Sequence, residues 1–157
     1  MKLSIKRGFS FGLTSGIITT LGLIVGLNSS TSSILVVISG ILVIAIADSM
    51  SDALGIHMSV ESENKSSTKE IWESTIATFL SKFLFALSFI VPFLFLQLSH
   101  AIIISVIWGL GLIAIFSYYM AKQENIKPYR AILEHLVIAI IVIITTHYVG
   151  EWIGTFG

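Results

Sequence analysis

Hydrophobic residues form long runs in this chain, and polar clusters interrupt them about every 20 to 25 residues, the spacing of membrane spans. Residues 8–47 and 83–121 contain no Asp, Glu, Lys or Arg, and each stretch can hold two spans. Crossing a hydrocarbon core takes roughly 20 apolar residues in a helix. The pattern predicts an all-α membrane protein with one domain, residues 1–157, and five transmembrane helices, at about 8–28, 34–56, 71–96, 101–121 and 129–150.

Polar segments connect these predicted helices. They are the turn NSSTSS (28–33), a short cytosolic loop (57–70) that includes ESENKSSTKE, a tight turn at Gln97, Ser99 and His100, and the loop KQENIKP (122–128). Pro92 lies inside the third predicted helix, and Pro128 suits the first turn of the fifth.

Composition agrees with a bilayer environment. The chain is 55% hydrophobic and 11% charged, whereas a soluble domain carries roughly a quarter charged residues. Its formal net charge is zero, which gives no reason to expect a nucleic-acid partner. Cysteine is absent, which excludes disulfides and thiolate chemistry. Because no nucleophile, base and orienting group converge in the sequence, we do not expect an enzyme.

Basic residues predict how the chain is oriented. Eight of the nine fall on one side of a five-helix arrangement, which makes the N-terminus cytoplasmic and the C-terminus external or lumenal. The start, MKLSIKRGF, resembles a signal peptide, but the apolar run after it is too long and no cleavage site follows, so we expect a retained first span. The predicted location is the plasma membrane if the chain is prokaryotic.

Two aspartates, Asp48 and Asp52, lie one turn apart in the second predicted helix. A carboxylate in hydrocarbon costs roughly 2.5 to 3.5 kcal/mol, so it normally faces a protein interior or a wet cavity. One interpretation is a functional cavity that holds a metal ion or a proton between them. The other is structural: Asp48 pairs with Lys82, which lies at a matching depth in the third helix, and Asp52 is hydrated.

Further polar residues near the cytoplasmic side could take part. His57, Met58, Glu61 and Glu63 offer metal ligands within two turns, although an ordinary interfacial histidine beside a solvated acidic loop explains them as well. Two others, Glu134 and His135, could relay protons or form a second ion pair with Lys82, or could simply lie at a helix start.

Glycines in the first predicted helix have the G-x-x-x-G spacing. Gly12 and Gly16 form one pair, and Gly22 and Gly26 form another. Small residues at this spacing let helices approach closely. The spacing favours a dimer interface over packing within one protomer.

Several stretches resemble the vacuolar iron transporter family. FGLTSGIITTLGLIVGL (11–27) is similar to its first helix, ALGIHMSVESE (53–63) to the end of its second, ATFLSKFLFALSFIVPFLF (77–95) to its third, and THYVGEWIG (146–154) to the end of its fifth. The resemblance implies a dimer whose first helices line a pore and which exports Fe²⁺ or Mn²⁺ from the cytosol in exchange for protons.

The chain departs from the family pattern at the site itself. Ser15 stands where the family has an Asp, Asp52 stands at the pore methionine, and Ile56 replaces a glutamate. About fifteen residues replace a long acidic metal-collecting domain. We therefore hypothesise that the carboxylate has moved to the second helix, where Asp48 and Asp52 would bind metal with Ser15 and Thr19 as weaker ligands.

The leading hypothesis is a homodimeric, proton-coupled exporter of Fe²⁺ or Mn²⁺, with Zn²⁺ as a further candidate and no permanently bound cofactor. A non-transporting relative with a structural or regulatory role is the main alternative. A third hypothesis keeps transport but, because of Lys82, moves an anion or only protons.

Overall fold

The computed structural model describes residues 2–63 and 65–156, which form α-helices and no strand. The helices are α1 (Leu3–Thr31), α2 (Ile34–Ser62), α3 (Thr68–Ser88), α4 (Ile90–Phe95), α5 (Leu98–Gln123) and α6 (Pro128–Gly154). Helices α3 and α4 together make one span, so 5 helical segments are long and apolar enough to cross a membrane. The predicted fold class, an all-α multi-pass membrane protein, is confirmed.

The helices are longer than the predicted spans, and the connections are shorter. Helix α2 continues to Ser62, well into the predicted loop, and α5 begins at Leu98, which makes the predicted turn at Ser99 and His100 helical. Hydroxyl groups help to explain the extension of α1 and α2. Thr31 Oγ1 donates to Leu27 O at 2.8 Å and Ser62 Oγ to Ser59 O at 2.8 Å, so these polar side chains are bonded within the helix.

The third span is interrupted near its proline. Helix α3 ends at Ser88, four residues before Pro92, and α4 follows after Phe89. A proline ring clashes with the carbonyl four residues earlier and lacks an N–H for the helical ladder, which accounts for the break at this position. At its other end α3 begins with a capping box, in which Ser67 and Glu70 bond reciprocally.

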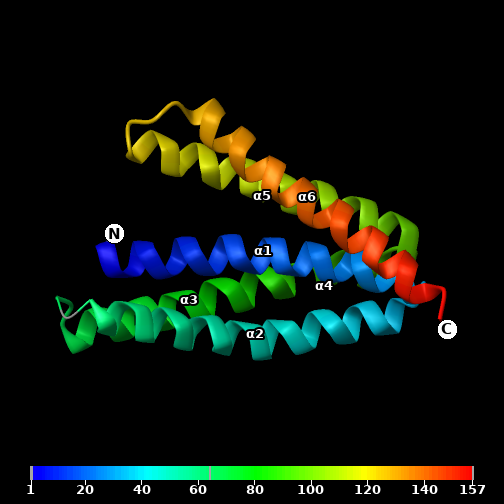
Figure 1. Cartoon of the computed structure of the whole chain (residues 1–157), viewed down its shortest axis with the longest axis horizontal. Helices are drawn as coiled ribbons and strands as arrows, with labels where there is room; N and C mark the ends of the chain where they lie inside the picture. Colours follow the sequence, from blue (N-terminus) through cyan, green and yellow to red (C-terminus); the bar gives the residue numbers. More distant parts are fainter. Residues whose placement is uncertain (1, 64, 157) are drawn as a thin grey trace.

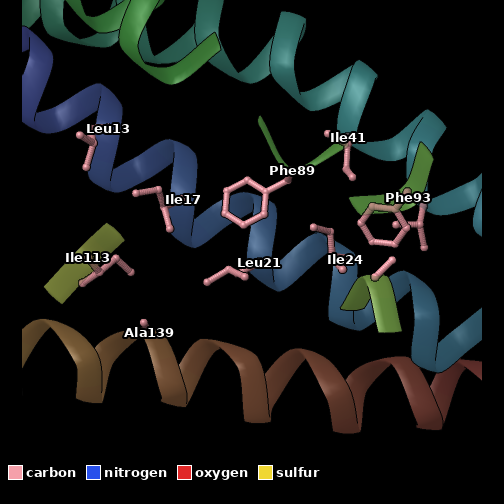
Figure 2. Close-up of a cluster of buried hydrophobic side chains, with 11 residues drawn as sticks. Leu13, Ile17, Leu21, Ile24, Ile41, Phe89, Phe93, Ile113 and Ala139 are labelled. Atoms are coloured by element: carbon pink, nitrogen blue, oxygen red, sulfur yellow. The ribbon is translucent and has the colours of Figure 1, made fainter. Parts of the chain in front are cut away.

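Helix α1 is the central element of the bundle. In Figure 1 it runs between α2 and α3 on one side and α5 and α6 on the other. Its buried residues Leu13, Ile17, Leu21 and Ile24 recur every three or four positions and form the spine of the hydrophobic core. Figure 2 shows these side chains among residues from the surrounding helices, which are Ile41, Phe89, Phe93, Ile113 and Ala139.

Glycines allow α1 and α3 to pack closely. A Cβ atom on Gly8 would collide with the Ser74 carbonyl, and one on Gly12 would collide with the Thr78 carbonyl. Two hydrogen bonds form across the short distance between the helices. Ser74 Oγ donates to Ser4 O at 3.0 Å, and Thr78 Oγ1 donates to Gly8 O at 3.2 Å. This contact fixes the rotation of α3 about its own axis.

The glycines predicted to favour a dimer interface make their close contacts within the chain. Gly12 and Gly16 face α3, while Gly22 and Gly26 face Thr146 on α6. Packing within one protomer, the alternative interpretation of their spacing, therefore accounts for all four.

Candidate functional site

The packing of α3 on α1 directs Lys82 into the bundle. Ser74, Thr78 and Lys82 follow one another at four-residue intervals, so they share the face of α3 that lies on the α1 glycines. At Gly16 the missing side chain leaves room for the lysine, because a Cβ there would lie 3.2 Å from Lys82 Cγ. The Lys82 side chain is consequently only 1% exposed.

Lys82 joins both aspartates of α2. Its Nζ lies 2.5 Å from Asp48 Oδ2 and 2.5 Å from Asp52 Oδ2. It also donates a hydrogen bond to Ser15 Oγ at 2.9 Å, and Ser15 Oγ donates in turn to Asp52 Oδ2 at 2.6 Å. We call these four residues, Ser15, Asp48, Asp52 and Lys82, the ionic cluster.

The sequence left open a cavity with a cation between the two aspartates or an ion pair of Asp48 with Lys82, and this arrangement has features of both. The pair between Lys82 and Asp48 is present, and Asp52 shares the same ammonium instead of being only hydrated. A single ammonium between two carboxylates removes most of their repulsion but leaves a formal charge of minus one. The carboxylates are therefore already arranged around a cation, which the protein itself supplies.

The ionic cluster is open on one side. The Asp48 side chain is 35% exposed and that of Asp52 is 21% exposed. Asp48 lies in a groove of about 490 Å³ between α1 and α2, whose other lining residues are Thr19, Leu23, Val43, Ile44, Ala47 and Ser51. Asp48 is therefore accessible from the outer face of α1 and α2.

Thr19, which we expect to be a weak oxygen ligand, lines the same groove. Its hydroxyl donates to Ser15 O at 2.7 Å, which leaves the oxygen lone pairs free to accept a bond or bind a cation. The site therefore brings together five of the sequence-predicted residues, Ser15, Thr19, Asp48, Asp52 and Lys82.

The predicted ligands at the end of α2 do not converge. His57 Nδ1 lies 3.0 Å from Thr75 Oγ1, Met58 is 61% exposed, and Glu63 pairs with Arg7 at 3.0 Å. Glu61 is exposed on the last turns of α2. Within residues 2–63 and 65–156 no group of three or more His, Asp or Glu side chains is positioned to hold a metal ion.

Glu134 and His135 lie on α6, in a different cavity from the ionic cluster. His135 Nδ1 is 2.7 Å from the buried Ser117 Oγ on α5. Among the described residues, no ion pair within 4.0 Å joins Glu134 to Lys82, whose partners are the two aspartates. The structure thus separates the predicted relay residues from the predicted transport site.

Sequence reasoning missed the cavity that holds Glu134 and His135. It lies between the start of α1, the end of α5 and the start of α6, with a volume of about 970 Å³, and four basic side chains line it. From the sequence, these basic residues served only to predict the orientation of the chain in the membrane. Their position at the ends of the predicted helices was the signal that could have indicated a basic cavity. The sequence did not show which helix ends lie side by side, because that depends on the tertiary fold.

Comparison with models of protein families gave no match, and neither did comparison with curated proteins.

Proposed function

We propose that this chain is a cation transporter similar to the vacuolar iron transporters, acting as a homodimer in a membrane, which is the plasma membrane if the chain is prokaryotic. Its substrate is a divalent metal, Fe²⁺ or Mn²⁺, exported from the cytosol in exchange for protons. The observation that carries the proposal is the position of the Lys82 ammonium between Asp48 and Asp52. Two carboxylates in a membrane helix, one turn apart and open to a groove, support this proposal because they could bind a cation.

Displacement is the mechanism that this geometry supports. An arriving divalent cation would enter the groove beside Asp48 and compete with the ammonium for the carboxylate oxygens. Hard oxygen ligands suit Mn²⁺ and Fe²⁺, and the Ser15 and Thr19 oxygens could complete the shell. With Lys82 bound the two carboxylates keep a formal charge of minus one, and a divalent cation in its place would neutralise them.

The exposure of Asp48 supports a dimer. In a single chain the Asp48 side chain, 35% exposed, would face the bilayer from the groove on α1 and α2. A lipid-facing carboxylate is costly, so this face needs a cover that is polar at that depth. A second copy placed face to face would bring two grooves, and four aspartates, into one central pathway.

The test is uptake of Fe²⁺ and Mn²⁺ into proteoliposomes under an imposed pH gradient. We expect gradient-dependent flux for the wild type and its loss in Asp48→Asn/Asp52→Asn. Glu151→Gln, at an exposed carboxylate near the end of α6, is the control and should retain flux. Absence of flux from well-folded wild-type protein with either metal would reject the proposal.

A second candidate function is favoured by one specific observation. The ammonium already neutralises much of the charge of both carboxylates, so the ionic cluster needs no metal to be stable. This favours a non-transporting membrane protein in which the ionic cluster only locks α1, α2 and α3 together. Flux measurements separate the two functions directly.

A further inference from the structure

The cavity between α1 and the α5–α6 pair, here called the basic cleft, takes no part in the proposed transport site. Figure 1 shows α5 and α6 diverging from α1 toward the connection between them. The cleft occupies about 970 Å³ at this end of the bundle. Its lining includes Lys6, Arg7, Phe116, Met120, Lys127 and Arg130.

Basic residues outnumber acidic ones in the lining of the basic cleft. Four basic and two acidic side chains line it, which leaves an excess of positive charge. Lys6 lies 3.8 Å from Glu124, and Arg7 bonds to Glu63. Lys127 and Arg130, by contrast, are exposed and have no carboxylate within 4.0 Å among the residues that the structure describes. These two cations are available for an anion.

Apolar side chains line part of the basic cleft, alongside polar ones such as Glu134. Phe11 on α1, together with Phe116 and Met120 on α5, contributes to the lining. Phe11 lies four residues beyond Arg7, or about 6 Å further along the helix axis. Phe11 itself is 42% exposed, so an apolar surface is left for a ligand to cover. Unpaired basic side chains next to an uncovered apolar surface match a molecule with an anionic head and a hydrocarbon tail.

We propose that the basic cleft binds an anionic phospholipid. The lipid phosphate lies between Lys127 and Arg130, and an acyl chain lies along Phe11, Phe116 and Met120. Basic pockets between membrane helices recognise lipid head groups in this way, because phosphate pairs with Lys and Arg while the tail remains in an apolar environment. A free phosphate would contact Lys127 and Arg130 but would leave the apolar side chains of the cleft uncovered.

The experiment measures lipid binding to the purified full-length protein in detergent. Native mass spectrometry would compare phosphatidylglycerol, phosphatidylcholine and inorganic phosphate as ligands. The variant is Lys127→Gln/Arg130→Gln, and its matched control is Lys65→Gln/Lys69→Gln, which removes two exposed charges near the start of α3 and outside the cleft. All four side chains are exposed, so the fold should be retained.

We expect the wild type to prefer phosphatidylglycerol, and the cleft variant to bind it on the order of thirty-fold more weakly, with the control unchanged. An equal loss in the control would mean diffuse surface attraction and overturn the proposal. So would equal binding of phosphatidylcholine, or binding of inorganic phosphate as tight as that of the lipid. If the cleft variant changed only the oligomeric state, the cleft would be a protein interface instead.

Discussion

At the level of single residues, the environment of Lys82 is the most informative feature of the protein. A fully buried lysine is tolerated only when paired, and here two carboxylates and a hydroxyl surround its ammonium. Each group in the ionic cluster is thus stable because of the others. Removing one leaves a charge that must find another partner.

Replacing Lys82 tests whether that partner can be a metal. We expect Lys82→Gln to lower the free energy of unfolding by about 3 kcal/mol in metal-free buffer, because Asp48 and Asp52 then repel each other without a counter-charge. Added Mn²⁺ should restore stability by binding between them. Chemical denaturation in detergent, with and without Mn²⁺, measures both effects.

Lys65→Gln, at an exposed lysine outside the ionic cluster, is the control and should change stability little in either buffer. If Mn²⁺ gave Lys82→Gln no more stability than it gives the control, the ionic cluster would be a structural ion pair, as the second candidate function requires.

At the level of helices, the α1–α3 contact decides the geometry of the site. Hydroxyl-to-backbone bonds and missing side chains hold these helices close together, and this closeness brings Lys82 to Ser15. Changes at the contact should therefore act on the ionic cluster without touching any charged group.

A substitution of Gly12 measures the importance of that contact. A methyl group there would collide with Thr78 O and Ser81 Oγ, so we expect Gly12→Ala to reduce stability by roughly 1–3 kcal/mol, the usual cost of overpacking. Thermal unfolding in detergent would measure the loss.

Gly55 and Gly111 offer matched controls in other helices, because a Cβ at either position meets nothing within 4 Å. Alanine is a better helix former than glycine, so Gly55→Ala and Gly111→Ala should be neutral or slightly stabilising. Equal destabilisation by all three substitutions would contradict the structural account of the glycines.

For the whole molecule, the distribution of basic residues makes the two ends of the bundle differ in charge. Eight of the nine lysines and arginines lie at one end, and the basic cleft opens there. The positive-inside rule predicts that this end is cytoplasmic.

The absence of native cysteine makes the orientation directly measurable. Ser99→Cys and Gln123→Cys place single thiols at exposed positions near opposite ends of α5. In intact cells a membrane-impermeant thiol reagent should label Ser99→Cys, and should label Gln123→Cys only after permeabilisation. The reverse pattern would invert the predicted topology.

A thiol cross-linker tests the proposed dimer. The two exposed positions compared are Val43, 63% exposed beside the Asp48 groove, and Ile103, 58% exposed on α5. Val43→Cys should give cross-linked dimers in membranes, whereas Ile103→Cys should give far fewer. Similar yields from both would argue against an interface formed by α1 and α2.

Sequence alone determined the class of the protein and the number of its spans, because apolar runs of membrane length have few alternative structures. It also placed Pro92 inside the third span, without predicting that the helix breaks there, and it singled out Asp48, Asp52 and Lys82 because charges are costly in hydrocarbon. The sequence did not determine whether these three side chains contact one another.

Only the tertiary structure decided how each helix is rotated. In a soluble protein the apolar stripe fixes that rotation, but here both lipid-facing and buried positions are apolar: Leu84 is 61% exposed, while Phe89 is fully buried. Packing of α3 on the α1 glycines turned Lys82 toward both aspartates, and divergence of α5 and α6 from α1 gathered the basic residues into a cleft. Both depend on contacts between residues far apart in the chain, which hydropathy does not encode.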